Sequence, residues 1–209
     1  MEVGYRGILF KHLYIDMDAY YSWYKYFIGY KIGAAVDTQT KSTVGGNYHS
    51  ITLNNIYRVA TNSEDIVTTS GISIALYYYV GKYIAITGNF SYNKLDRHGS
   101  TDPLIPAYNT PEHKYNLGVN ARDIKHFGFN INYRWVEGYY FEGSPQYTGP
   151  IDDYGVIDMQ VNRKFPRYHS AIKIGVNNLL NKEHYEVYGG PLVGRMAYVT
   201  FQYGFNPQH

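Results

Sequence analysis

Few side chains in this sequence are spaced for catalysis. Asp16 and Asp18 are two residues apart, and in an extended strand that spacing places both carboxylates on one face. Such a pair can act as acid and base, but the same spacing is typical of a polar strand face in water. Asp152 and Asp153 could bind calcium, although adjacent acids in a polar segment usually mark a solvated loop end. The sequence has no nucleophile elbow, no His-Glu-x-x-His and no P-loop, so we expect neither an enzyme nor a cofactor.

The eight histidines are scattered, and most fall in turns or loops. His49, His98 and His113 lie in or beside predicted loops, where they could ligate haem or a metal. A lone loop histidine, however, is more often simply solvated. The chain has no cysteine, which rules out disulfides and thiolate metal sites. We therefore predict no metal site.

Arginines and tyrosines are better suited to holding a ligand than to converting one. Two arginines end the polar faces of predicted strands, and several tyrosines lie in or next to predicted loops, where their rings could stack on a ligand. The same rings could instead form the aromatic girdle of a membrane protein. The candidate ligand-binding residues are Arg122, Arg134, Tyr139, Tyr147, Tyr154, Tyr185 and Tyr188.

Composition limits the class of protein. Aromatic residues make up 18% of the 209 residues, and 26 residues are tyrosine. Charged residues make up 17%, below the roughly 25% of soluble domains. The net charge of +2 is too small to indicate nucleic acid as a partner, and the basic residues form no stripe along the sequence. The sequence contains no run of about 20 apolar residues, which is the length that a transmembrane helix needs.

The elements that position these residues follow a period of two, which is the period of β-strands. In the last strand, residues 197–205, Ala, Val, Phe, Tyr and Phe alternate with Tyr, Thr, Gln and Gly. Phe201, Tyr203 and Phe205 would close a barrel here, with an aromatic residue at the membrane boundary. Similar alternation predicts eight more strands, near residues 2–10, 13–28, 72–80, 84–92, 115–122, 127–135, 157–162 and 172–177.

The connections between these strands alternate between short and long. Tight turns are predicted near residues 11, 81, 125 and 166, and long polar loops at 31–65, 96–112, 142–153 and 181–195. Short periplasmic turns and long extracellular loops are typical of outer-membrane barrels. Counting back from the last strand, the first strand would begin outside. Because the count is odd and no signal peptide precedes it, we expect residues 1–209 to be a single barrel segment without the N-terminal strands.

The polar face of the predicted sheet is rich in Asn and in charged residues. A small barrel would have to pair these groups tightly, whereas a large barrel exposes them to water or a plug. Their density favours the large barrel. Two alternatives stay open: a soluble sheet with one wet face, such as a β-sandwich binding module, and a small nine-stranded pore that closes through one parallel pair.

The C-terminal third resembles the end of TonB-dependent outer-membrane receptors. The similarity lies in the run Gly175-Val-Asn-Asn-Leu-Leu-Asn-Lys182, in His184-Tyr185, and in Gly194-Arg195 before the last aromatic strand. The runs Tyr26-Phe27-Ile28, Val67-Thr-Thr-Ser-Gly71 and Ser91-Tyr-Asn-Lys-Leu95 are similar to the same family. The Tyr-rich style is most similar to receptors of Bacteroidetes-type bacteria.

This resemblance implies an all-β, antiparallel, up-and-down transmembrane barrel segment, the last nine strands of a 22-stranded barrel in a Gram-negative outer membrane. The family's plug domain has no counterpart in the sequence. The implied role is part of the wall and loops of a transporter that imports a siderophore, haem, cobalamin or an oligosaccharide. Implied partners are outer-membrane lipids, the rest of the barrel and plug, the TonB–ExbB–ExbD system and a surface lipoprotein lid.

Overall fold

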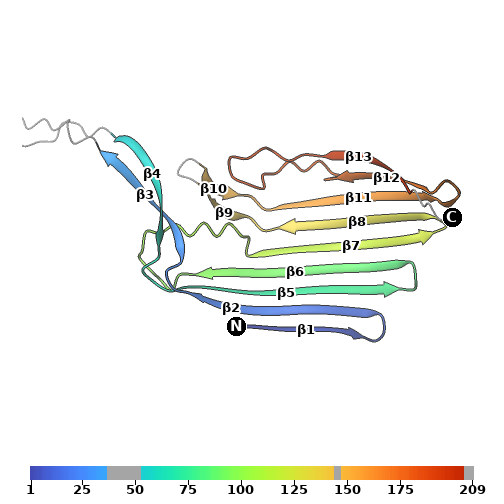
Figure 1. Cartoon of the computed structure of the whole chain (residues 1–209), viewed down its shortest axis with the longest axis horizontal. Helices are drawn as coiled ribbons and strands as arrows, with labels where there is room; N and C mark the ends of the chain where they lie inside the picture. The colour runs from blue at the N-terminus through green and yellow to red at the C-terminus, as the bar shows by residue number, and fades with distance from the viewer. Residues whose placement is uncertain (37–52, 144–146, 205–209) are drawn as a thin grey trace, which may run out of the picture.

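The computed structural model describes residues 1–36, 53–143 and 147–204. One antiparallel sheet of nine strands dominates it, and each strand pairs with its neighbours in chain order once two separate hairpins are set aside (Figure 1). The nine strands are β1 (Glu2–Leu9), β2 (Leu13–Tyr24), β5 (Val67–Val80), β6 (Ile84–Asp96), β7 (His113–Ile124), β8 (Phe127–Val136), β11 (Tyr154–Phe165), β12 (Ser170–Asn177) and β13 (Met196–Tyr203). The predicted nine-stranded up-and-down sheet is confirmed.

The short and long connections lie at opposite ends of the sheet (Figure 1). The turns β1–β2, β5–β6, β7–β8 and β11–β12 form one end, which we call the short-turn end. They are tight enough to require left-handed backbone, with φ of 65° at Gly81 and 71° at His126. The β11–β12 turn is a single 3-10 turn, Pro166–Tyr168, closed by left-handed His169. The other end, the long-loop end, holds every long connection.

Two predicted loops contain β-hairpins, which the sequence analysis missed. The predicted strand 13–28 ends early, at Tyr24, and β3 (Ile28–Val36) starts just before the predicted loop 31–65 and pairs with β4 (Leu53–Asn62). Around the predicted loop 142–153, β9 (Tyr139–Glu142) pairs with β10 (Thr148–Ile151). The β3–β4 hairpin projects away from the sheet (Figure 1). Because neither face of β3 or β4 has to be apolar there, apolar and polar residues alternate only weakly in their sequence. His49 and Phe205 lie outside the described residues.

The register aligns like side chains across the strands. Ile86 pairs with Val119, Val119 with Ile131, and Ile131 with Met159. One residue further along, Asn120 pairs with Asn130, and Asn130 with Gln160. Because successive side chains alternate between faces, one face of the sheet is apolar and the other polar. We call them the outer face and the lumen face.

The outer face is exposed and has the height that a membrane requires. Ten residues of β8, at about 3.3 Å each, span about 33 Å, so a strand tilted by about 40° crosses the ~25 Å apolar band. Aromatic side chains stand at both edges of this band. At the long-loop end Tyr115 stacks on Trp135 with ring centroids 5.3 Å apart. The described part of the chain contains no helix long and apolar enough to span a membrane.

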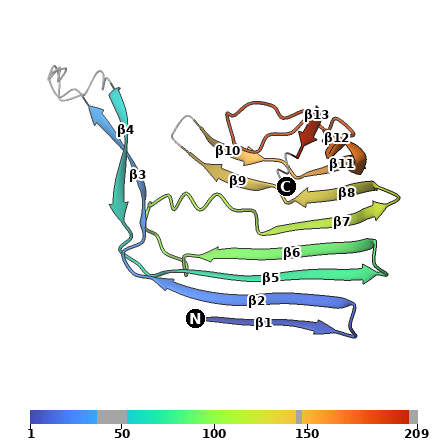
Figure 2. The ribbon, with the colours of Figure 1, turned by 45° about the vertical axis from the view of Figure 1, so that its right-hand side comes forward.

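Most buried apolar side chains lie at the long-loop end rather than between sheet layers. Val67, Val136, Tyr154 and Val156 are buried where β5, β8 and β11 reach the loops, and Leu104 is only 1% exposed within a loop. Figure 2 shows that the sheet curls at its β11–β13 edge. Among the described residues the sheet stays open, because β1 and β13 each pair with one neighbour.

Candidate ligand-binding surface

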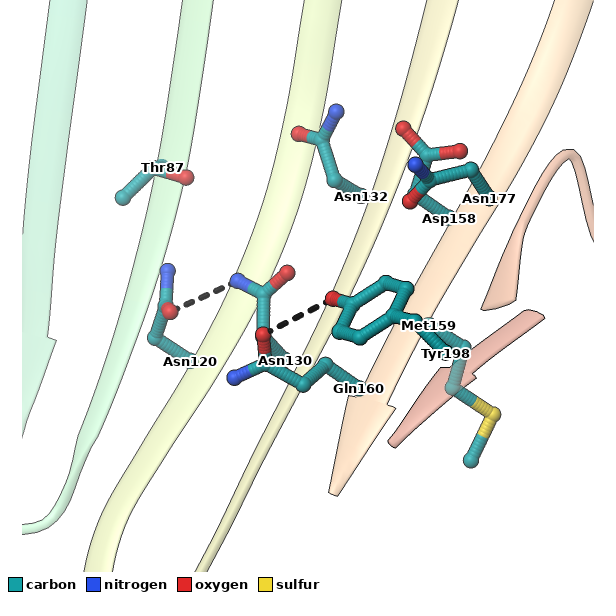
Figure 3. A pocket seen from close by; sticks show the side chains of 9 residues that line it. All are labelled: Thr87, Asn120, Asn130, Asn132, Asp158, Met159, Gln160, Asn177 and Tyr198. Atoms are coloured by element: carbon teal, nitrogen blue, oxygen red, sulfur yellow. Dashed lines mark hydrogen bonds between the residues drawn. The ribbon is translucent and has the colours of Figure 1, made fainter. Parts of the chain in front are cut away.

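The lumen face carries a row of amide groups that bond across strands. Asn130 donates to Asn120 at 2.6 Å, and the Tyr198 hydroxyl donates to Gln160 at 3.1 Å (Figure 3). The Tyr198 ring lies over Gly175, where a Cβ would collide with it. These groups, with Asn132, Asp158 and Asn177, line a shallow hollow of about 320 Å³. The polar face that the sequence predicted therefore carries side chains that hydrogen-bond between neighbouring strands.

A larger hollow of about 690 Å³ continues this row toward the long loops. Asn132, Asp158 and Asn177 line both hollows. The wall on the loop side is supplied by Arg134 at the end of β8 and by residues of the β12–β13 loop. Those loop residues are His184, Glu186 and the segment 192–195, and Met196 at the start of β13 adjoins them.

Three side chains that line this outer hollow converge next to the ring of Tyr154. Arg134 Nη2 lies 3.3 Å from Glu186 Oε1, and His184 Nε2 lies 3.7 Å from the same oxygen. The imidazole of His184 stacks on the ring of Tyr154, with centroids 4.0 Å apart. The guanidinium of Arg134 lies 5.9 Å from the centre of that ring. Cation, imidazole, carboxylate and phenol thus meet at one point.

Two nitrogen atoms of this cluster have no hydrogen-bond partner in the described part of the chain. They are Arg134 Nε and His184 Nε2, and both are buried. The side chain of His184 is only 4% exposed, and its Nδ1 lies 2.9 Å from the carbonyl oxygen of Lys182. Because a carbonyl only accepts, Nδ1 must carry a proton and donate it in a hydrogen bond to Lys182. An unpaired guanidinium N–H beside a hollow suits a ligand with hydroxyl or carboxylate oxygens.

The Asn-Leu-Leu-Asn-Lys run builds the loop that carries His184. Asn178 is buried; its amide nitrogen Nδ2 donates to the carbonyl of Lys182, and its Oδ1 accepts from the Lys182 amide, both at 2.8 Å. The backbone N–H of Asn178 donates to Asp158 on β11. Asn181 accepts a bond from the amide of Arg195 at 2.8 Å. These bonds fold the loop back over the lumen edge, which brings His184 against Tyr154.

The β9–β10 hairpin packs against the same loop. The ring of Tyr188 lies over Gly149, and the ring of Tyr147 lies over Gly189. The Tyr139 hydroxyl donates to the Glu186 carbonyl at 3.3 Å. Burial, and then the nearby Glu186 carboxylate, raise the pKa of Tyr139 above its ordinary value. Tyr139 therefore stays protonated and acts as a donor at neutral pH.

The structure brings together some of the candidate residues and separates others. Arg134 lines the outer hollow. Tyr154 stacks on His184 beside it, Tyr139 bonds the Glu186 carbonyl, and Tyr147 and Tyr188 lie in the adjoining hairpin contact. Arg122 lies near the short-turn end beside Lys82 and Tyr83, away from this cluster. Tyr185 follows His184 in the loop and is about half exposed.

Sequence reasoning missed His184 and Glu186 as members of the site. The available signal was their spacing of two, which places both side chains on one side of an extended segment. The histidines that were considered have other neighbours: His98 bonds Thr68 at 2.9 Å, and His113 bonds Glu137 at 2.8 Å. Across residues 1–36, 53–143 and 147–204, no three His, Cys, Asp or Glu side chains gather to hold a metal.

The carboxylates considered for acid–base chemistry stand in ordinary surroundings. Asp16 forms an ion pair with Arg6 at 2.8 Å on the lumen face, and it accepts a hydrogen bond from Tyr14. Asp152 and Asp153 are exposed at the end of β10, as expected of a solvated loop end.

A second set of loop contacts at the long-loop end gathers around Asp102. Asp102, whose side chain is 3% exposed, pairs with Lys31 of β3 at 3.1 Å and accepts from the amides of Glu64 and Leu104. The Glu64 amide, then Lys31 and the Leu104 amide, hold the pKa of Asp102 below its ordinary value, against the raising effect of burial. This one carboxylate joins β3, the β4–β5 turn and the β6–β7 loop.

The same β6–β7 loop also holds the β9–β10 hairpin. Asn109 exchanges hydrogen bonds with the backbone of Glu142, at 2.7 and 3.0 Å, and the Glu142 carboxylate accepts from the amide of Ala107. Tyr30 and Ile105 pair as an isolated β-bridge. The β3–β4 and β9–β10 hairpins and the β6–β7 and β12–β13 loops are therefore connected to one another at the long-loop end of the sheet. We call them the loop layer.

A curled sheet with an apolar outer face, a polar lumen face and tight turns at one end defines the wall of an outer-membrane β-barrel. Residues 1–179 match the family described as TonB dependent receptor-like, beta-barrel. The chain belongs to this family. It is accordingly a protein of the Gram-negative outer membrane and a member of a family of transporters rather than enzymes.

Solved structures share the fold. The copper transporter OprC matches with a TM-score of 0.72 at 13% identity, over 98% of this chain and 30% of that one. The FrpB iron transporter from Neisseria meningitidis (F5-1 variant) matches at 0.65 and 15% identity, over 97% and 30%. The siderophore receptor PiuA from Acinetobacter baumannii matches at 0.61 and 12%, over 95% and 27%. The chain thus spans under a third of the length of these structures. No curated protein sequence matches it.

Proposed function

We propose that this chain forms part of the wall and the outer vestibule of a receptor that imports a scarce ligand across the outer membrane. The observation that carries the proposal is the outer hollow, where Arg134, His184 and Glu186 converge on the lumen side of a family barrel. The chain covers 30% of the length of the copper transporter, so further strands and a plug are proposed for the complete receptor.

The open sheet supports a large barrel over the small pore. β1 and β13 each have one free edge among the described residues, and a barrel must pair every edge. In a 22-stranded barrel of this type the present strands would be the last nine, and β13 would pair with the first strand of the complete wall. The soluble β-sandwich is wrong, because the strands form one sheet of an outer-membrane family rather than two packed layers.

The ligand classes remain those that the resemblance implied: a siderophore, haem, cobalamin or an oligosaccharide. The names of the similar structures include a copper transporter, an iron transporter and a siderophore receptor. An unpaired guanidinium nitrogen and an unpaired imidazole nitrogen favour a ligand rich in hydroxyl or carboxylate oxygen. Energy for import would come from the TonB–ExbB–ExbD system, which would act through the plug. A surface lipoprotein lid stays a prediction, and so does a source among Bacteroidetes-type bacteria.

The test is ligand uptake by cells that carry the receptor. We expect uptake of one labelled ligand from the four classes to depend on TonB and to fall at least tenfold with Arg134→Ala, since a charge-assisted hydrogen bond contributes about 1.5–3 kcal/mol. Lys114→Gln is the matched control, because Lys114 is a lumen-facing cation at the same end without a place in the hollow. Equal uptake by both variants would contradict the assignment of the hollow.

A further inference from the structure

The short-turn end of the sheet carries a strong excess of positive charge. We define the short-turn rim as residues 10–12, 81–83, 122–126 and 163–169, which are the four tight turns and the strand ends beside them. Its charged residues are one acid, Asp123, and the bases Lys11, Lys82, Arg122, Lys125, Arg163, Lys164 and Arg167. In a chain with a net charge of +2, the rim is therefore basic and the rest of the chain is acidic.

Only one of these bases has a carboxylate partner among the described residues. Lys164 pairs with Asp123 at 2.8 Å. The Lys82 ammonium lies 4.8 Å from the centre of the Tyr83 ring, and the Arg163 guanidinium contacts two aromatic rings instead of an acid. Like charges gathered without acids repel one another, so an anion from outside the described chain would stabilise the rim.

Arg163 is the informative member because it lies on the outer face. It alternates with Val161 and Phe165 along β11, and its register partners are Phe127 and Ile172, which belong to the apolar face. Its guanidinium lies 4.9 Å from the centre of the Phe127 ring and 5.0 Å from that of Phe165. A guanidinium held over aromatic rings at the edge of a lipid-facing band is placed at the depth of lipid headgroups.

We propose that the short-turn rim binds the phosphate groups of anionic phospholipids in the periplasmic leaflet, with Arg163 and Arg167 as the main contacts. The guanidinium fork matches two phosphate oxygens, and each basic side chain near an anionic surface strengthens binding about fivefold. Arg163 lies on the face that meets the membrane, where a soluble anion or an acidic protein would have no access to it. We therefore propose a lipid, rather than a soluble partner, as the source of the phosphate. The proposal rests on the family orientation, in which short turns face the periplasm.

The experiment measures lipid binding by the whole chain folded in detergent. Native mass spectrometry gives the Kd for phosphatidylglycerol and for zwitterionic phosphatidylcholine. We expect tighter binding of phosphatidylglycerol, and a loss of about fivefold for Arg163→Gln, with a further fivefold when Arg167→Gln is added. Arg163→Lys keeps the positive charge and should keep most of the preference for phosphatidylglycerol. It therefore separates loss of charge from any weakening of the fold that follows loss of the ring contacts.

Lys94→Gln is the matched control at the opposite end. Lys94 lies on the outer face of β6, in register with Ser70, and is exposed. Its removal should leave the preference for phosphatidylglycerol unchanged. Equal affinity for the two lipids, or an equal loss in Lys94→Gln and Arg163→Gln, would overturn the proposal, and so would full displacement of the lipid by inorganic phosphate. None of these outcomes depends on ligand uptake, so the proposed function and the lipid site can fail separately.

Discussion

Lys173 and Ile174 are neighbours in β12, yet they face different solvents. Lys173 points to the lumen beside the amide row, and Ile174, which is 55% exposed, points outward in register with Val161 and Val199. The same contrast repeats across the nine strands. An exposed isoleucine is unfavourable in water and favourable in lipid, whereas an exposed lysine is the reverse. The wall is thus defined by which solvent each face meets, not by a buried core.

The largest expected effect comes from reversing this contrast at mid-strand. Ile174→Arg places a charge in the hydrocarbon and should cost about 2–4 kcal/mol of folding free energy in a bilayer. Lys173→Ala removes a charge that faces water and should cost little. Urea titration of refolding into vesicles measures both. Equal costs for the two variants would show that the two faces do not meet different solvents.

This contrast could be predicted from the sequence because it depends on local alternation. A period of two assigns each side chain of β12 and β13 to a face without knowledge of the neighbouring strands. The outer hollow could not be predicted in the same way. His184 reaches Tyr154 only because Asn178 and Asp158 fold the β12–β13 loop back, which is a tertiary event. The β3–β4 hairpin escaped detection because a hairpin away from the sheet needs no apolar face.

The second contrast is between the open wall and the packed loop layer. Leu104 is 1% exposed in the β6–β7 loop, where it lies against Gly29. Leu104→Ala should therefore cost about 2–5 kcal/mol locally, as for other buried leucines. Hydrogen exchange at the Tyr30 amide, which bonds to Ile105, reports this loss. Leu180→Ala is the matched control because Leu180 is 69% exposed; similar acceleration in both would show that the loop layer is not packed around Leu104.

Acid should loosen the loop layer and leave the wall intact. The folded pKa of Asp102 is lowered, so its contribution is present above the unfolded value of about 4 and is lost as pH falls through the folded value. Exchange at the Tyr30 amide, corrected for intrinsic pH dependence, should therefore rise below about pH 4. Asp102→Asn should remove this dependence. Persistence of the same pH response in Asp102→Asn would assign it to another group.

The smallest effect is expected on the lumen face. Asn130→Ala removes the hydrogen bond to Asn120 in a region that water reaches, so the loss should be about 1 kcal/mol or less. Refolding titrations in vesicles measure it on the scale used for Ile174→Arg. A loss above about 2 kcal/mol would indicate a dry, tightly packed lumen, as in a small barrel, and would count against the large one.

The central claim, that one face meets lipid and the other water, is tested most directly by labelling. The sequence contains no cysteine, so a cysteine introduced at each of positions 171–174 and 176 gives a single spin label per variant. In vesicles, collision with oxygen reports lipid and collision with a water-soluble nickel complex reports water. We predict alternation, with positions 172, 174 and 176 accessible to oxygen and 171 and 173 to nickel; Gly175 is left out because the Tyr198 ring covers it. Uniform access to nickel along β12 would contradict the account.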